Sequence, residues 1–191
     1  MPDSKHDKSR GVEPSKHFKT VKDTDAFSGN VVSFVDRTIV DNDGNEYSRD
    51  VVTHPGAVAI VALDGDNKIT LVKQYRAPVD GDIWEIPAGK VDVPGEPAVE
   101  TAKRELAEEA GLGAEKFEPI GGIYQSAGFS DEFCEIFLAT ELSSVPQNLD
   151  GPEEEVMTVA SFDLDEALAM IQDRRITDAK TVVGILSAAR L

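Results

Sequence analysis

Three glutamates of one predicted helix, Glu105, Glu108 and Glu109, are the residues whose types and spacing could do chemistry. Their i, i+3, i+4 spacing places the carboxylates on neighbouring positions of one helix face. Like charges at this spacing repel one another and cost helix stability, and a bound divalent cation would compensate for that repulsion. Because the donors are hard oxygens without Cys or His, the cluster favours Mg²⁺, with Mn²⁺ as a possible substitute, over zinc.

A solvated acidic helix face, with Arg104 paired to Glu108, is the alternative interpretation of these residues. At about 100° per residue, however, Glu109 projects inside the apolar stripe that includes Ala102 and Leu106. A carboxylate in that position loses hydration and needs a partner. The position of Glu109 therefore favours a metal-binding cluster over a solvated face.

The helix that must position this cluster is expected to begin near Pro97 and to end at Gly111. Proline is favoured at the first helical position because its missing N–H would have no helical partner there. Glycine tolerates the left-handed backbone conformation that ends many helices. The two residues therefore bracket the acidic cluster as start and stop signals.

The rest of the chain predicts β-strands followed by late helices. Two β-rich runs, residues 31–40 and 46–53, flank an Asp-Gly turn, which predicts a hairpin. Residues 56–63 form an almost continuous apolar run, as expected for a strand covered on both faces. Further extended segments are expected at 68–75, 84–87, 117–124, 132–139 and 157–162, and helices at 163–173 and from 178 to the C-terminus. This mixture predicts an α+β layered domain.

The chain is expected to divide into three parts. Residues 1–23 are polar, with six basic and four acidic side chains, and we predict a disordered tail there and no signal peptide. Residues 24–55 hold the predicted N-terminal β-hairpin, a possible dimerisation element. Residues 56–191 would then form the main domain.

The composition excludes several classes of function. Of the 191 residues 36 are acidic and 19 basic, and the formal net charge of −17 excludes a general nucleic-acid binder and argues against docking on an anionic membrane. No apolar run approaches the ~20 residues of a membrane-spanning helix. The single cysteine, Cys134, cannot form an internal disulfide, so a cytoplasmic protein is expected.

The segment from Gly89 to Leu112 resembles the signature of the Nudix hydrolases. From Glu96 onward the match is complete, with seven residues followed by Arg104-Glu105-Leu106-Ala107-Glu108-Glu109-Ala110-Gly111-Leu112. The signature usually has five residues between the glycine and the first glutamate, and this chain has six. The extra residue falls in the turn-forming stretch 91–95, where loops absorb insertions.

Segments outside the signature resemble the bacterial ADP-ribose pyrophosphatases of the same family. They are Gly56–Ala62, Gln74–Arg76, Trp84–Gly89 and the loop Gly128–Glu132, so that the likeness covers roughly residues 27–190. This subfamily usually has a proline about fifteen positions after the signature, where this chain has Ala127.

The resemblance implies a Nudix fold, an α/β/α sandwich with a mixed β-sheet, to which the N-terminal antiparallel hairpin is added. The implied activity is Mg²⁺-dependent hydrolysis of the pyrophosphate bond of ADP-ribose to AMP and ribose 5-phosphate. Another nucleotide sugar or a dinucleotide is the alternative substrate, and a binding module for ADP-ribose without turnover is the alternative from another class. The implied partners are a small nucleotide sugar and a second copy of the chain in a homodimer, with no nucleic acid and no membrane.

The resemblance also assigns roles within the acidic cluster. The implied metal ligands are Glu105, Glu109 and the backbone carbonyl of Ala88, with Glu108 assisting and Glu96 either binding metal or holding the loop. Arg104 is implied to orient the cluster through ion pairs.

Candidate substrate contacts lie outside the cluster. Arg76 is a candidate phosphate contact or a surface ion pair, because a guanidinium fork matches phosphate oxygens. Glu85 is a candidate partner of a ribose hydroxyl, and Trp84 is a stacking platform or a core residue. Gly128 and Ser130 belong to the segment that resembles the substrate loop.

The catalytic base is implied to be a glutamate of the loop at residues 143–155. Glu154 is the first candidate and Glu153 the second, and Glu155 stays open. Solvated loop acids are the alternative interpretation. A loop of this kind could close only over bound substrate, which would prevent idle hydrolysis.

Overall fold

The computed structural model describes residues 10–148 and 156–191, and its internal contacts divide the chain into two compact units. The first unit contains Met1–Pro55 with Gly122–Phe133, and the second contains Gly56–Gly121 with Cys134–Leu191. The acidic cluster and the helices belong to the second unit.

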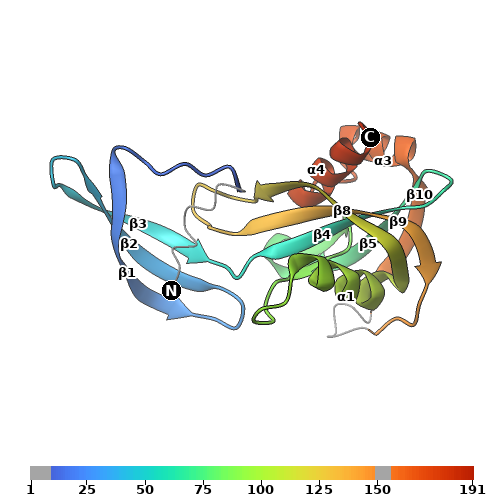
Figure 1. Ribbon diagram of the computed structural model, residues 1–191, viewed down its shortest axis with the longest axis horizontal. Helices are drawn as coiled ribbons and strands as arrows, with labels where there is room; N and C mark the ends of the chain where they lie inside the picture. The colour runs from blue at the N-terminus through green and yellow to red at the C-terminus, as the bar shows by residue number, and fades with distance from the viewer. Residues whose placement is uncertain (1–9, 149–155) are drawn as a thin grey trace. The chain divides into compact units, whose positions relative to one another are not determined.

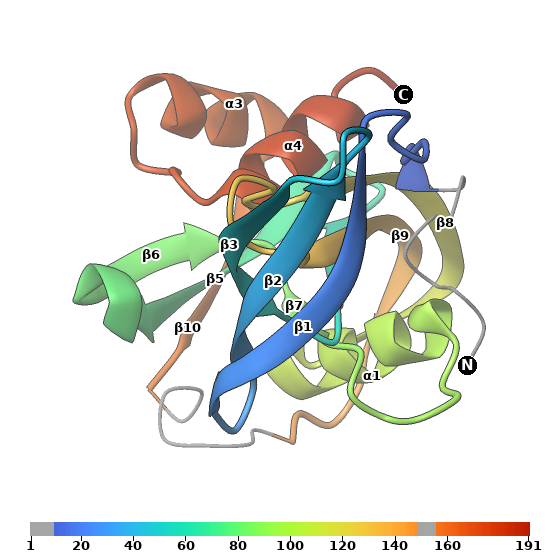
Figure 2. The ribbon, with the colours of Figure 1, turned by 90° about the vertical axis from the view of Figure 1, so that its left-hand side faces the viewer.

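The first unit is built on a three-stranded antiparallel sheet in the order β1-β2-β3, with β1 at Phe18–Ser28, β2 at Ser33–Asp41 and β3 at Glu46–Thr53 (Figures 1 and 2). The predicted hairpin is the β2–β3 pair. Its turn is held by Asp41, whose Oδ1 accepts the backbone N–H groups of Asp43 and Asn45, each at 2.9 Å. Gly44 supplies the positive φ of +85° that this turn needs.

The predicted tail at residues 1–23 is too long, because its residues from Phe18 onward belong to β1. Every residue of β1 is exposed, so no buried face requires a periodic apolar pattern that would identify the strand. Its pairing with β2, the Arg37–Asp23 ion pair at 2.8 Å and the edge-on contact between Phe18 and Tyr47 hold it in place. The rest of the division into domains stays a prediction, and residues 1–9 lie outside the described part.

The second unit contains most of a mixed β-sheet in the strand order β10-β5-β4-β9-β8, with β6 paired to β5 and β7 paired to β4. The ends of β8 and β9 that fall within Gly122–Phe133 are assigned to the first unit. β4 pairs in parallel with β9 and in an antiparallel manner with β5 and β7. The strands are β4 at Ala57–Leu63, β5 at Lys68–Arg76, β6 at Gly81–Glu85, β7 at Ala88–Lys90, β8 at Leu112–Tyr124, β9 at Phe133–Ser144 and β10 at Thr158–Asp163, and a short 3-10 helix occupies Ala77–Val79.

Helices cover both faces of this sheet, with α1 at Ala98–Ala110 on one side and α3 at Leu164–Gln172 and α4 at Ala179–Ala188 on the other (Figures 1 and 2). α1 contacts β4 and β7, and α4 contacts β4 and β6. The predicted α/β/α sandwich with a mixed sheet is therefore confirmed for this unit. Within the described residues, no helix is both long enough and apolar enough to cross a membrane.

The central strand β4 is almost entirely apolar because both of its faces are buried. Val58 to Ala62 are all fully buried. Val58, Ile60 and Ala62 pack with Ala102 and Leu106 of α1, which accounts for one face. On the other face, Val61 lies against α4.

The predicted start and stop signals hold for α1. Pro97 is the N-terminal cap of α1, and Gly111 ends it with a φ of +64°. Asp178 caps α4 by accepting the backbone N–H of Thr181 at 3.0 Å. Asp163, the N-terminal cap residue of α3, makes no side-chain capping hydrogen bond, and its carboxylate pairs with Lys68 Nζ at 3.1 Å.

Candidate functional site

Glu109 occupies the buried position in α1 that the apolar stripe predicts. Glu109 is only 4% exposed, and its Oε2 accepts a hydrogen bond from the backbone N–H of Ala88 at 2.9 Å. The carboxylate is therefore held by the start of β7, which packs against α1. This contact brings together two of the predicted metal ligands, Ala88 and Glu109.

Arg104 joins the other acidic residues of the cluster. Its Nη1 lies 2.8 Å from Glu105 Oε1 and 2.8 Å from Glu108 Oε2, and its Nη2 lies 3.7 Å from Glu96 Oε2. Burial opposes the charge of Arg104, but Glu105 and Glu108 outweigh that effect and raise its guanidinium pKa. Its Nε is buried and has no hydrogen-bond partner among the described residues.

Gly89 explains how Glu105 fits against β7. A Cβ on residue 89 would lie 1.9 Å from Glu105 Cδ and 2.1 Å from its Oε1. No side chain can occupy this space while Glu105 stays in place. The glycine of the predicted signature is thus required by close approach of a carboxylate to the backbone.

Glu96 lies at the loop that leads into α1. Its Oε2 accepts a hydrogen bond from Thr101 Oγ1 at 2.7 Å, and its backbone N–H donates to Val93 O at 3.1 Å. Glu96 therefore holds the loop to the first turns of the helix. The extra residue in the spacer is accommodated in this turn, where Gly95 has a φ of +82°.

The donor set fits a divalent cation by its chemistry, because the candidates are hard carboxylate and carbonyl oxygens. Across residues 10–148 and 156–191, however, no three Asp, Glu, His or Cys side chains converge as a set of metal ligands. Arg104 instead compensates the charges of Glu105 and Glu108. A cation at these carboxylates would compete with Arg104, and the metal-binding roles stay predictions.

Arg76 and Glu85 form a bidentate ion pair between β5 and β6. Arg76 Nε donates to Glu85 Oε1 at 2.7 Å and Nη2 donates to Oε2 at 2.8 Å. The hydrogen bonds to Glu85 are the main cause that raises the pKa of Arg76. Glu85 is only 1% exposed, and this geometry favours a positioning role over the predicted contact with a ribose hydroxyl.

Lys180 is the second cation bound to Glu85, and sequence reasoning missed it. Its Nζ donates to Glu85 Oε2 and lies 3.0 Å from Asp178 Oδ1. Burial alone would raise the pKa of Glu85, but Arg76 and Lys180 outweigh burial and lower it. The available signal was a charged lysine within a mostly apolar helix, residues 179–188.

Trp84 and the predicted substrate-loop residues have structural contacts of their own. The Trp84 ring packs edge-on against Phe162 at a centroid distance of 5.1 Å, which favours its interpretation as a packing residue. Gly128 and Ser130 belong to the first unit. Ser130 Oγ accepts the backbone N–H of Glu132 at 3.2 Å, and a role of this loop in substrate binding stays a prediction.

The candidate bases Glu153, Glu154 and Glu155 lie outside the described residues. The segment that precedes them is fixed to the end of α1. Gln147 Nε2 donates to the backbone carbonyl of Glu109 at 2.5 Å, and Val145 N donates to Gly111 O at 2.9 Å. The described start of the predicted loop is therefore bound to the backbone of Glu109 and Gly111.

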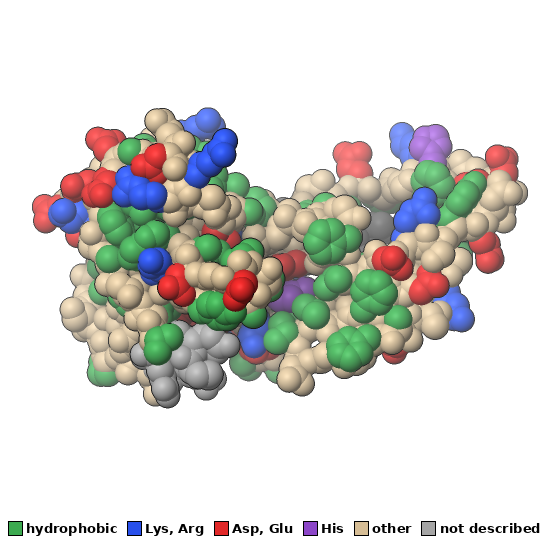
Figure 3. Space-filling view, turned by 180° about the vertical axis from the view of Figure 1, so that it is seen from behind, with side chains coloured by type: hydrophobic (Ala, Val, Ile, Leu, Met, Phe, Trp, Pro, Cys, Tyr) green, Lys and Arg blue, Asp and Glu red, His purple; other side chains and the backbone are tan. Residues whose placement is uncertain are grey.

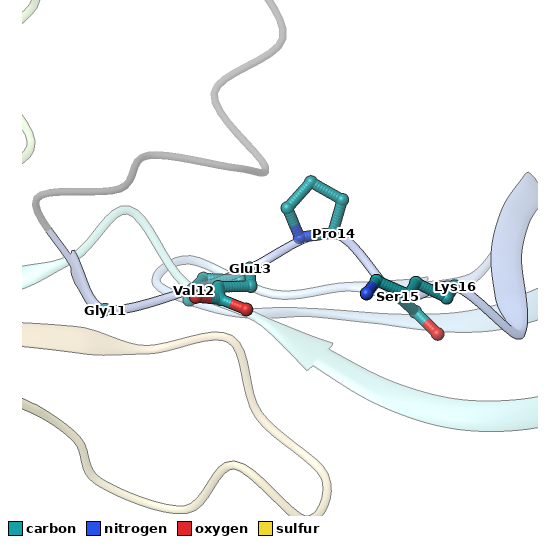
Figure 4. A pocket seen from close by; sticks show the side chains of 6 residues that line it. All are labelled: Gly11, Val12, Glu13, Pro14, Ser15 and Lys16. Carbon is teal, nitrogen blue, oxygen red and sulfur yellow. The ribbon is translucent and has the colours of Figure 1, made fainter.

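A hollow of about 570 Å³ lies along residues 11–16 in the first unit (Figure 4). Figure 4 shows this segment extended, and its lining residues carry none of the predicted catalytic or metal-binding side chains. The hollow therefore does not compete with the acidic cluster as a candidate active site.

The chain is similar to several known proteins. A family described as the NUDIX domain matches residues 53–182. An ADP-ribose pyrophosphatase of Bacillus subtilis is 40% identical over 167 residues, which cover 87% of this chain and 90% of that protein. A methanol dehydrogenase activator of Bacillus methanolicus is 42% identical over 168 residues, with the same coverage of both chains. A crystal structure of an ADP compounds hydrolase matches 94% of this chain and 96% of its own with a TM-score of 0.77, and at 19% identity it supports the fold alone.

Proposed function

The chain belongs to the Nudix family of pyrophosphohydrolases, and from that premise we propose that it hydrolyses ADP-ribose to AMP and ribose 5-phosphate with Mg²⁺. One structural observation carries the proposal. Glu109 is buried against the Ala88 amide while Glu105 and Glu108 share Arg104 in the same helix. The 40% identity to a relative named ADP-ribose pyrophosphatase supports the substrate.

The reaction adds one water across the P–O–P bridge of the substrate. Nudix hydrolases generally need a divalent metal, and a cation held by Glu105, Glu109 and the Ala88 carbonyl would neutralise pyrophosphate charge and activate water. Arg104 would orient Glu105 and Glu108, and Arg76 would add positive charge near the phosphates. Glu154, or in second place Glu153, would accept the proton of the attacking water.

The net charge of −17 is compatible with an anionic substrate. Most acidic side chains form an ordinary solvated surface, and the field of the whole chain repels anions. A cation bound among the clustered glutamates would reverse the sign of the charge locally. The positions of a few glutamates therefore decide the ligand more than the total charge does.

Product analysis tests this function directly. Purified full-length chain is incubated with ADP-ribose and Mg²⁺, and AMP and ribose 5-phosphate are separated by chromatography. Equimolar release of both products that stops in excess chelator supports the proposal. Unchanged turnover without divalent cation would contradict it.

The relative named a methanol dehydrogenase activator favours a second candidate function, in which this chain activates a dehydrogenase. The two activities are separable because activation requires the partner enzyme in the assay. Rates of a methanol dehydrogenase with and without this chain decide that point.

A panel of GDP-mannose, other nucleotide sugars and dinucleotides decides the substrate. Calorimetric binding of ADP-ribose without product would indicate a binding module.

The first unit supports the proposal of a homodimer. Its sheet and the β1–β2 turn expose large apolar side chains that a monomer would leave in water: Phe18, Val21, Phe27, Val31, Val32, Phe34 and Tyr47. Figure 3 shows hydrophobic side chains interspersed with charged ones on this sheet. Light scattering at micromolar concentration should give the mass of a dimer, and a monomer mass would contradict the proposal.

We propose a reducing cytoplasm as the compartment of this protein, because its single cysteine excludes an internal disulfide.

A further inference from the structure

The first turn of α4 holds the segment that connects β6 to β7. The backbone N–H of Ile86 donates to Thr181 Oγ1 at 2.9 Å, and Thr181 Oγ1 donates to Asp178 Oδ2 at 2.6 Å. Lys180 Nζ binds both Glu85 Oε2 and Asp178 Oδ1. Two adjacent residues of α4 thus bind two adjacent residues that lie 95 positions earlier in the chain.

Residues 85–88, which run from the last residue of β6 to the first residue of β7, are each held by a hydrogen bond or an ion pair. Glu85 is bound by Arg76 as well as by α4. The carbonyl of Pro87 accepts the N–H of Ile60 at 2.8 Å, and the N–H of Ala88 donates to Glu109 Oε2. A displacement of Glu85 or Ile86 would therefore reach, within three residues, the amide that holds Glu109.

Three residues that join α4 to this segment, Lys180, Thr181 and Ile86, are buried. Lys180 is 6% exposed and Thr181 is fully buried, as is Ile86. A buried ammonium group and a buried hydroxyl cost free energy unless their partners are in place. Their placement in the first turn of an apolar helix is therefore expensive, and the bonds to Glu85 and Ile86 compensate for the cost.

A second observation shows how closely α4 approaches the segment. A Cβ on Gly184 would lie 2.9 Å from Ile86 Cδ1 and 2.9 Å from Val61 Cγ2. The absence of a side chain at this position lets the helix sit directly on Ile86. The polar contacts at the first turn and the close packing one turn later therefore hold the same residue.

We propose that Lys180 and Thr181 are positioning residues that fix residues 85–88 and, through the Ala88 amide, the orientation of the Glu109 carboxylate. Neither side chain touches the reacting atoms. The kinetic part of this inference rests on the proposed hydrolase function, and its structural part does not.

The test uses Thr181→Val, which keeps the shape of the side chain but removes the hydroxyl, and Thr181→Ser, which keeps the hydroxyl. In Thr181→Val we expect kcat for ADP-ribose to fall about tenfold, because small misplacements of catalytic groups cost this much or more, while KM changes less than twofold. Amide exchange followed by NMR should become about tenfold faster at Ile86 and Ala88, as local opening becomes easier. Thr181→Ser should restore most of kcat and of the amide protection.

Ile185→Val is the matched control, because Ile185 is fully buried in the same helix and has no hydrogen-bonding side chain. It should lower the melting temperature without changing kcat or the exchange of Ala88. The inference is overturned if Thr181→Val keeps kcat and Ala88 exchange within twofold of those of Ile185→Val. Lys180→Met tests the contact between Lys180 and Glu85 in the same way. If Lys180→Met does not fold, the result for Thr181→Val alone decides. If the wild type does not hydrolyse ADP-ribose, the proposed function fails, and the exchange data alone still decide the positioning role.

Discussion

Gly89 lies so close to Glu105 that a Cβ on residue 89 would be 1.9 Å from the Glu105 carboxyl carbon. The two residues come from β7 and α1, which pack against each other. The relationship gives the first residue of the signature a steric role. It also makes the position of a predicted metal ligand depend on a residue that has no side chain.

Gly89→Ala should displace Glu105 without disrupting the core. We expect kcat for ADP-ribose to fall about 100-fold, since a shift near 1 Å in a catalytic group has that effect. Circular dichroism should show an unchanged fold. Gly65→Ala is the matched control, because a Cβ there meets no atom within 4 Å. If Gly89→Ala and Gly65→Ala have equal kcat values, the close approach has no bearing on activity.

Glu109→Gln should separate the charge of Glu109 from its hydrogen bond. The amide oxygen of glutamine can still accept the Ala88 N–H, so we expect the melting temperature to change little. Loss of the charge that we propose binds the catalytic cation should lower kcat by about 100-fold or more. Glu100→Gln is the control, because Glu100 is half-exposed on the same helix and pairs with Lys103. Full activity of Glu109→Gln would remove Glu109 from the metal site.

The stabilising effect of Glu85 should depend on pH in both directions. Burial opposes the charge of Glu85, but Arg76 and Lys180 outweigh it and lower the pKa of Glu85 in the fold. The contribution of the Glu85 charge to the free energy of unfolding is therefore complete above the unfolded pKa of about 4.3. It is lost as pH falls through the lower folded pKa. Burial opposes the charge of Lys180, but Glu85 and Asp178 outweigh it and raise the pKa of Lys180. The contribution of the Lys180 charge to the free energy of unfolding is therefore complete below the unfolded pKa of about 10.4. It is lost as pH rises through the higher folded pKa.

Glu85→Gln measures this window. Because the substitution leaves two cations beside a buried neutral group, we expect it to lower the free energy of unfolding by about 3 kcal/mol at pH 7. Urea denaturation of both proteins across pH should show a constant difference between about pH 5 and 10 and a smaller one outside that range. A difference that grows towards acidic pH would contradict the assignment.

Much of the main sheet and the acidic helix follows from local sequence patterns. The apolar run of β4 and the Pro97 and Gly111 signals of α1 depend on neighbours in the chain, and the stripe around Glu109 depends on helical geometry alone. β1 escaped prediction because none of its side chains is buried. The pairing of Lys180 with Glu85 could not be predicted, because it joins residues 95 positions apart through the packing of α4 on β6.

Arg104 should compete with a divalent cation for the same carboxylates, and Arg104→Met tests this without an activity assay. Because Glu105 and Glu108 lose their shared partner, the metal-free variant should be destabilised by about 1 kcal/mol, or roughly 3 °C in melting temperature. Mg²⁺ should then raise the melting temperature more in Arg104→Met than in the wild type, since a bound ion stabilises the folded state and no longer displaces Arg104. Lys103→Met, which removes an exposed cation from the same helix, should respond to Mg²⁺ as the wild type does. Equal Mg²⁺ responses in all three proteins would place the metal away from Glu105 and Glu108.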